Sequence, residues 1–246
     1  MPVRALAVGG MKEMTTDFPG FSREALRFLV DLAVNNERSW FQPRKAEYER
    51  LLKEPLEGLC AALGQEFMVR GIPLASDPAR SPFRIYRDVR FSKDKSPYKT
   101  QVSASFPWTG DGGGVGGYFH LQPGEVFVGG GMWHPSSARL NAWRKVVVED
   151  RAQVHATLDD PDFVAAFGKV SGEHLKRAPT GYPQDDPDID LLRLKDVTFG
   201  RSLSDDATLS NELPATIAET LGRATPLLRL LAGLPGHETP AGWLRD

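Results

Sequence analysis

The chain has 246 residues, of which 41% are hydrophobic and 25% are charged, and its formal net charge at pH 7 is −2. This composition is that of an ordinary soluble globular protein, and the length allows one large domain or two small ones. A net charge so close to zero argues against a dedicated nucleic-acid binder, whose surface carries a large basic excess, so nucleic acid is an unlikely partner.

A disordered N-terminal tail is predicted for residues 1–16, because no periodic pattern precedes Asp17. The apolar run in this tail is too short for an export signal or a membrane span. Translation could start at Met1, Met11 or Met14. We therefore expect a cytoplasmic protein that does not associate with a membrane.

Two helices are predicted between Ser22 and Gly64. Ser22 is a plausible N-cap of the first, whose apolar residues recur at helical spacing as far as the pair Asn35–Asn36. The second begins near Pro43 and keeps its helical phase through Pro55, where we expect a kink or a break. Gly64 is expected to end this second helix.

A basic strand and turn form the most informative stretch of the sequence. The strand is predicted from Phe83 to Phe91, and because successive side chains of a strand face opposite sides, one face is apolar and interrupted only by Arg87. That face is expected to pack in the core. The other face carries Arg84, Tyr86, Asp88 and Arg90, and the following turn carries Lys93, Lys95, Tyr98 and Lys99.

Further elements complete the fold. Alternating patterns predict strands at residues 101–106, 117–122, 125–128 and near 197–199. Helices are expected after Ser136 or Ser137, from the pair Asp160–Pro161, and between residues 214 and 231. Short turns between the strands indicate an antiparallel meander.

The domain organisation predicted from these elements is simple. We expect a single α+β domain over residues 17–232, with a mainly antiparallel sheet packed by helices from the N- and C-terminal parts of the chain. Residues 233–246 are expected to form a C-terminal tail. No internal repeat or linker divides the domain.

Four segments carry a resemblance to a known family. They are FPGFSREALRFLVDLAVNNERSWF, PFRIYRDVRFSKDKSPYKT, GYFHLQPGEVFVGGGMWHP and LKRAPTGYPQDDPDIDLLRLK. In order and spacing they resemble the bacterial and fungal family catalogued as domain of unknown function family 2461, over roughly Phe18 to Arg223. The resemblance implies one compact domain of mixed helix and sheet in a cytoplasmic protein. It implies no activity, substrate or catalytic residue.

The basic strand and turn are the best candidate for a ligand site, because clustered Arg and Lys side chains suit phosphate or carboxylate groups. The glycines at 129–131, ahead of an expected helix start at Ser136, could add an anion-binding helix N-terminus. The predicted ligand-binding residues are Arg84, Tyr86, Arg90, Lys93, Lys95, Tyr98, Lys99, Gly130, Gly131 and Ser136.

Other interpretations of the same residues stay open. The cations could form a flat, solvated face, or they could pair with the acidic loop at residues 185–190 in a structural ion network. The glycines at 129–131 could instead serve a tight crossing from strand to helix or close packing.

Catalysis is an open question at this stage. Asp88 and His120 are the candidate proton carriers, since His120 is expected to border the basic site. No histidine has the spacing of a metal site, and no metal or cofactor is predicted. The glycines at 112–117 match G-x-G-x-x-G, but the motif runs into a predicted strand, whereas a dinucleotide-binding site requires a helix at that point. The single cysteine, Cys60, permits no intrachain disulfide, which suits the cytoplasm.

Two functions are compatible with these features. The first is a cytoplasmic protein that binds a small ligand bearing phosphate or carboxylate at the basic strand and turn. The alternative is a non-catalytic interaction module that uses the same basic surface for a protein or nucleic-acid partner, with Trp40, Tyr98 and Trp108 as stacking groups. A concave pocket with convergent cations would favour the first, and a flat basic stripe the second.

Overall fold

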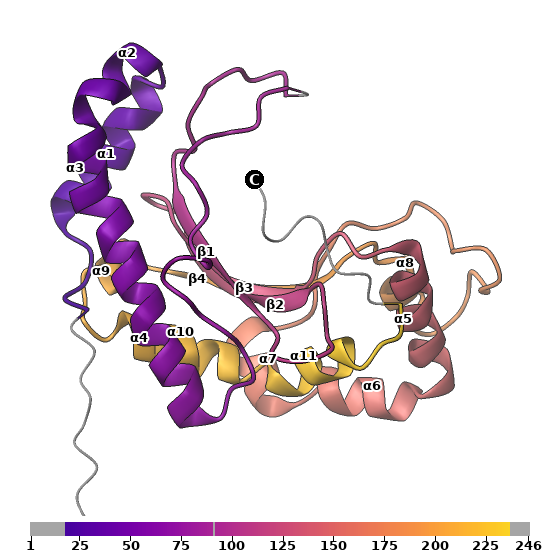
Figure 1. Ribbon diagram of the computed structural model, residues 1–246. Helices are drawn as coiled ribbons and strands as arrows, with labels where there is room; N and C mark the ends of the chain where they lie inside the picture. The colour runs from indigo at the N-terminus through magenta and orange to yellow at the C-terminus, as the bar shows by residue number, and fades with distance from the viewer. Residues whose placement is uncertain (1–17, 91, 237–246) are drawn as a thin grey trace, which may run out of the picture.

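The computed structural model describes residues 18–90 and 92–236 (Figure 1). The tail predicted at residues 1–16, most of the tail predicted at 233–246, and Phe91 lie outside the described residues. Within the described part, no helix is both long enough and apolar enough to cross a membrane.

A four-stranded antiparallel sheet forms the centre of the domain. Its strands are β1 (Val102–Pro107), β2 (Val115–Leu121), β3 (Val126–Met132) and β4 (Val197–Leu203), and they neighbour one another in chain order. All three pairings are antiparallel. The predicted α+β domain with an antiparallel meander is confirmed.

The N-terminal helices form one bent column beside the sheet (Figure 1). They are α1 (Arg23–Val34), α2 (Arg38–Phe41), α3 (Lys45–Tyr48) and α4 (Glu54–Arg70), with a 3₁₀ turn η1 (Gln42–Arg44) and a π turn η2 (Glu49–Lys53) between them. Ser22 caps α1 as predicted, since its hydroxyl accepts the amide of Ala25 at 3.1 Å. The irregularity expected near Pro55 takes the form of the π turn that ends just before it.

The prediction that Gly64 ends the second helix is wrong. The helix α4 continues to Arg70 and ends at Gly71, whose φ of 65° is the left-handed conformation that glycine adopts without strain. A Cβ atom on Gly64 would lie 2.8 Å from the carbonyl oxygen of Ser76, so this glycine permits a close approach between α4 and the following segment.

The remaining helices follow the strands. They are α5 (Ser137–Glu149), α6 (Arg151–Leu158), α7 (Pro161–Phe167), α8 (Ile189–Arg193), α9 (Asp205–Thr208), α10 (Leu213–Gly222) and α11 (Thr225–Ala232). The helices α4, α10 and α11 pack against the sheet and bury Ala104, Phe119 and Val128 completely. Leu234 also belongs to the core, so the packed chain extends past residue 232.

The glycine run at residues 129–131 lies inside β3, not at the end of a strand as expected. Each of these glycines pairs with β2 on one side and β4 on the other. The ring of Phe127 leaves no room for a side chain at two glycines, because a Cβ atom would lie 2.7 Å from this ring at Gly129 and 2.0 Å from it at Gly200. At Gly130 and Gly131 the neighbouring strands are too close, since a Cβ atom would lie 2.4 Å and 2.2 Å from backbone carbonyl oxygens. Gly129 and Gly200 therefore make room for a ring that lies over the sheet.

The strand predicted from Phe83 to Phe91 is not a regular strand. Residues 82–90 and 92–99, which we call the basic ribbon, form a loose hairpin beyond β1 with isolated bridges from Pro82 to Ala104 and from Tyr86 to Tyr98. Proline has no amide hydrogen, so Pro82 and Pro97 cannot donate to a ladder. The predicted alternation nevertheless holds, since Ile85 is buried while the four polar residues of the other face are exposed.

Candidate functional site

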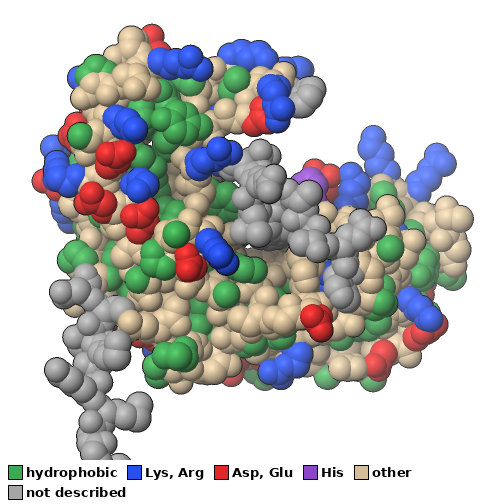
Figure 2. Space-filling view, viewed as in Figure 1, with side chains coloured by type: hydrophobic (Ala, Val, Ile, Leu, Met, Phe, Trp, Pro, Cys, Tyr) green, Lys and Arg blue, Asp and Glu red, His purple; other side chains and the backbone are tan. Residues whose placement is uncertain are grey.

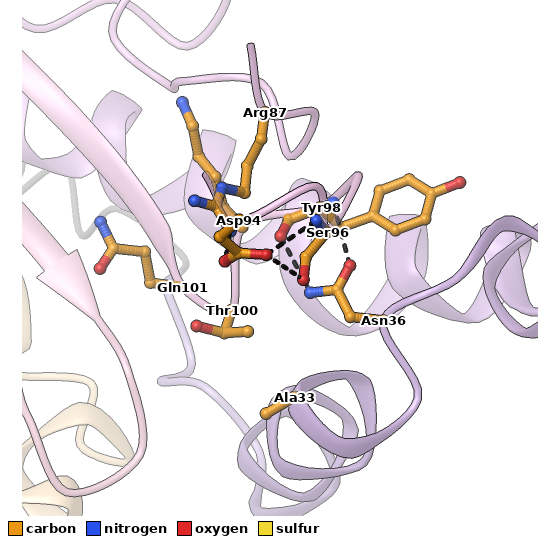
Figure 3. A pocket seen from close by; sticks show the side chains of 9 residues that line it. Ala33, Asn36, Arg87, Asp94, Ser96, Tyr98, Thr100 and Gln101 are labelled. Carbon is orange, nitrogen blue, oxygen red and sulfur yellow. Dashed lines mark hydrogen bonds and ion pairs between the residues drawn. The ribbon is translucent and has the colours of Figure 1, made fainter. Parts of the chain in front are cut away.

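The basic ribbon is anchored to the helical column by Asn36. The side-chain amide of Asn36 donates to the carbonyl oxygen of Tyr98 at 3.0 Å, and its oxygen accepts the Tyr98 amide at 3.0 Å. The Tyr98 ring is 1% exposed and stacks on Phe41 with the ring centroids 4.1 Å apart. Tyr98 was expected to contact a ligand through its ring or hydroxyl, but this ring points away from the Arg87 and Asp94 side chains into the core (Figure 3).

A pocket of about 400 Å³ lies between the end of α1 and the basic ribbon, and we call it the ribbon pocket. It is lined by Ala33, Asn36, Arg87, Asp94, Ser96, Tyr98, Lys99, Thr100 and Gln101 (Figure 3). Its charged groups are two cations and one carboxylate, and most of the other lining side chains are amides or hydroxyls. The ribbon pocket therefore combines positive charge with several neutral hydrogen-bonding groups.

Arg87 is the arginine that the fold directs into the ribbon pocket. Its guanidinium forms an ion pair with Asp94, whose carboxylate also accepts the amide of Ser96 at 2.9 Å and its hydroxyl at 2.7 Å. The hydrogen bonds from Ser96, with the Arg87 guanidinium, hold the pKa of Asp94 well below its usual range. Our sequence analysis did not place Arg87 in the site, although its position on the apolar face was a signal that it points inward.

The other two arginines of the ribbon lie on its exposed face. Arg90 pairs with Asp88, with Nη2 and Oδ2 2.5 Å apart, and the hydrogen bonds from Arg90 lower the pKa of Asp88 to about 2. Asp88 is therefore ionised at neutral pH and does not carry a proton there. Arg84 and Tyr86 are exposed on the same face, outside the lining of the ribbon pocket.

Of the three lysines of the turn, one lines the ribbon pocket and two lie outside its lining. Lys99 is half-buried, lines the ribbon pocket and places its Nζ 5.3 Å from the centroid of the Phe83 ring. Lys95 donates to the carbonyl oxygen of Val89 at 2.8 Å, and Lys93 is exposed; neither lines the pocket. Figure 2 shows Lys and Arg side chains gathered over the projecting ribbon and, separately, over the lobe that holds α5 and α8.

The fold does not bring Gly130, Gly131 or Ser136 to the ribbon pocket. The two glycines pair within the sheet, as described above, so their amides do not face a helix start. Ser136 caps α5, where its hydroxyl accepts the amide of Arg139 at 3.3 Å and donates to the carbonyl oxygen of Gly236 at 3.2 Å. The helix start predicted at Ser136 is confirmed, but its cap has structural partners.

His120 also lies outside the ribbon pocket lining. Its ring stacks on Phe127 with centroids 5.5 Å apart, and its Nε2 is buried without a hydrogen-bond partner among the described residues. Burial lowers its pKa, so the neutral form is favoured. The connection to the pocket is indirect: Tyr118, whose ring lies 5.6 Å from His120, accepts a hydrogen bond of 3.2 Å from the pocket residue Gln101.

The acidic loop pairs with α6 rather than with the basic ribbon. Arg151 binds Asp186 at 2.9 Å and also contacts Asp188, and Nε2 of His155 lies 2.8 Å from Asp188. The hydrogen bond to Asp188 raises the pKa of His155. The sequence separation of these partners explains why this cluster was not predicted. Over the described residues, no group of three or more His, Cys, Asp or Glu side chains is placed to hold a metal ion.

Comparison with known proteins gives one match. A family model described as "Conserved hypothetical protein (DUF2461)" matches residues 24–229, which is most of the chain, and this agrees with the resemblance carried by the four motifs. No curated protein and no solved structure matches the chain significantly.

Proposed function

The chain belongs to the DUF2461 family of conserved hypothetical proteins, and from the geometry of the ribbon pocket we propose that it binds a small anionic ligand there. The observation that carries this proposal is the convergence of Arg87 and Lys99 on one concave pocket of about 400 Å³. Pockets for small molecules have volumes of roughly 300–1,000 Å³ and place a few polar groups around the ligand.

The charges of the pocket indicate the kind of anion. Arg87 and Lys99 bring two positive charges and Asp94 one negative charge, so the lining favours a ligand with one or two negative charges. A carboxylate or phosphate group matches the planar fork of an arginine. The hydroxyl of Thr100 and the amide of Gln101 supply further hydrogen bonds.

Arg87 would reach such an anion without losing its orientation. The ion pair with Asp94 holds the guanidinium in place. An arginine has five N–H donors, and a single carboxylate does not use all of them, so donors remain for a ligand. A side chain that is already oriented loses less conformational entropy when it binds a ligand.

Calorimetric titration with inorganic phosphate, citrate and a nucleoside monophosphate tests this proposal. Arg87→Gln and Lys99→Gln should each weaken binding about tenfold, since a hydrogen bond to a charged group contributes about 1.5–3 kcal/mol. The matched control is Arg84→Gln, which removes the same charge from the exposed face of the ribbon. Equal affinity in wild type and both pocket variants would refute the proposal. Binding only of oligonucleotides, lost in the Arg84 variant and weakened by salt, would instead favour the interaction module.

We also infer that the protein acts in the cytoplasm. Cys60 is buried, and burial raises the pKa of its thiol to about 12, so this thiol is unreactive. The fold therefore requires no disulfide, which suits a reducing compartment. Fractionation of cells that express the protein would test this, and recovery in an exported fraction would contradict it.

A further inference from the structure

A second pocket lies between α5 and the segment 175–180. In Figure 1, α5 lies on the opposite side of the sheet from α1, which borders the ribbon pocket. Its volume is about 570 Å³, and we call it the α5 pocket. It is lined by Asn141, Arg144, Leu175, Lys176, Arg177, Ala178, Pro179 and Thr180. The segment LKRAPT begins the fourth sequence motif, which the ribbon pocket does not use.

Arg144 is a buried cation in the lining of this pocket. Its side chain is held by two hydrogen bonds, from Nε to the carbonyl oxygen of Leu192 at 3.0 Å and from Nη1 to Oδ1 of Asn141 at 3.1 Å. The residue is 8% exposed, and no carboxylate of the described residues pairs with it. Burial lowers its pKa, the direction expected for a cation without a counterion.

Arg139, on the same helix, shows what a buried arginine with a purely structural role looks like here. It is 2% exposed, lies outside both pockets, and donates to the carbonyl oxygens of Gly113 and, at 2.8 Å, Leu231. Arg144 differs because it borders an open cavity. Its Nη2 makes no hydrogen bond to the described residues and is not enclosed, so it has donors left for a ligand.

Two more cations line the same pocket. Lys176 and Arg177 are exposed and form no ion pair with other described residues, and no carboxylate is among the lining residues. The ribbon pocket, in contrast, contains Asp94. Three cations facing one cavity without a carboxylate make a site of strong positive potential, which attracts anions.

The segment that carries these cations is attached to the last residue of α8 at its start and is closed by a turn near its end. The amide of Leu175 donates to the carbonyl oxygen of Arg193 at 2.8 Å, and the Arg193 side chain returns a hydrogen bond to Leu175 at 2.6 Å. At the other end, the amide of Tyr182 donates to the carbonyl oxygen of Pro179 at 3.2 Å. The cavity is therefore formed without a ligand, which reduces the entropy lost when one binds.

We propose that the α5 pocket is a second anion-binding site, which takes a small molecule bearing a phosphate group. Arg144 binds the phosphate oxygens from the floor of the pocket, Lys176 and Arg177 close over them, and the hydroxyl of Thr180 donates a further hydrogen bond. A doubly charged phosphate matches three cations better than a carboxylate does. The volume leaves room for an organic group beside the phosphate. This site is independent of the ligand proposed for the ribbon pocket.

Titration of the ¹⁵N-labelled protein with inorganic phosphate, pyrophosphate and glucose 6-phosphate tests the assignment. Amide signals of residues 141–144, 175–178 and 180 should shift on addition of each probe and saturate. Tighter binding of the sugar phosphate than of inorganic phosphate would identify a phosphomonoester as the ligand class. Tighter binding of inorganic phosphate or pyrophosphate would assign the site to the free ions.

The variant Lys176→Gln/Arg177→Gln should bind each probe at least about tenfold more weakly, by loss of charge-assisted hydrogen bonds. These side chains are exposed, so the variant should remain folded, which its amide spectrum checks. Arg84→Gln/Lys169→Gln removes the same charge from exposed positions outside both pockets and should bind like wild type. Arg144→Lys keeps the charge but loses the guanidinium fork, and should also weaken binding.

Three results would overturn the assignment. One is an equal loss of affinity in the control variant, which would indicate non-specific attraction. Another is saturation that shifts only signals around the ribbon pocket. The third is binding of heparin or oligonucleotides alone. Arg87→Gln separates this site from the ribbon pocket, because that variant should keep phosphate binding at the α5 pocket even if the ribbon pocket binds nothing.

Discussion

Asn36 binds Tyr98 as a neighbouring strand would, with one hydrogen bond to the backbone amide and one to the carbonyl oxygen, both 3.0 Å long. Tyr98 lies 62 residues further along the chain, in the basic ribbon. Between the two arms of the ribbon, the Lys99 amide donates to the carbonyl oxygen of Ile85, and the Arg87 amide donates to that of Pro97. One side chain at the end of α1 thus completes the hydrogen bonding of the segment that forms the ribbon pocket.

Asn36→Ala should lower the free energy of unfolding by about 1–3 kcal/mol, because it leaves two part-buried backbone groups of Tyr98 without partners. Urea denaturation measures this loss. Asn35→Ala is the matched control, since Asn35 is exposed and its side chain donates to the carbonyl oxygen of Asp31 in the neighbouring turn of α1. A similar effect of the two substitutions would show that Asn36 does not anchor the ribbon.

Asp94→Asn should strengthen anion binding in the ribbon pocket. The substitution removes the one carboxylate of the lining and frees Arg87 from its ion pair, so affinity for phosphate should rise about three- to tenfold. Isothermal titration of wild type and variant at equal ionic strength measures the change. Weaker binding in the Asn variant would contradict this expectation and would mean that the orientation that Asp94 gives to Arg87 contributes more to affinity than the negative charge of Asp94 costs.

Gly200→Ala should destabilise the protein by about 1–3 kcal/mol, as overpacking does, because the added Cβ would lie 2.0 Å from the Phe127 ring. The nearest atoms all belong to that ring, so Phe127→Ala in the same chain should remove the clash. Thermal unfolding of the two single variants and the double variant should therefore be strongly non-additive. Additive losses would show that Gly200 is required for another reason.

The cluster of His155, Asp188 and Asp159 should make stability depend on pH. The folded state raises the pKa of His155 above its ordinary value of 6.5, mainly through the hydrogen bond to Asp188. Arg151 also binds Asp188, and its positive charge opposes this increase in the pKa. A raised pKa stabilises the fold fully below pH 6.5, and this contribution disappears as pH rises through the folded pKa. His155 is substantially exposed, so the effect is below about 1 kcal/mol.

The melting temperature of wild type should therefore fall more than that of His155→Gln between pH 6 and pH 8. His174→Gln serves as the control, since His174 is exposed and takes no part in the ion pairs of this cluster. Parallel pH profiles of wild type and His155→Gln would show that the ion pairs of this cluster do not contribute to stability.

The sequence predicted those parts of the fold that depend on near neighbours. The caps at Ser22, Ser136 and Asp160 are local hydrogen bonds, and each begins a helix as expected. The alternation along the ribbon likewise separated Ile85 from the exposed polar face, although the regular ladder is absent. Local chemistry decides such features, so they can be read from a short window of sequence.

Long-range contacts account for what was missed. Glycine is common at the ends of helices, which is why Gly64 was predicted to end one. Only the close approach of Ser76 in the folded chain shows why glycine is needed at this position. The partnership of Asn36 with Tyr98 and the pairing of Arg151 with Asp188 join segments far apart in sequence. The inward direction of Arg87 could have been predicted, because its place on the apolar face was visible, whereas the pocket that receives it depends on α1.

The position of β4 in the sheet has a consequence for how the protein folds. The hairpins β1–β2 and β2–β3 join strands separated by short turns, so they can form early and independently. The strand β4 pairs with β3 only after the chain has passed through α5, α6, α7 and α8. Closing this longer loop costs more conformational entropy than closing either hairpin, and the cost comes before any contact between β3 and β4 compensates for it. We therefore expect β4 to join the sheet late in folding, after the two hairpins have formed.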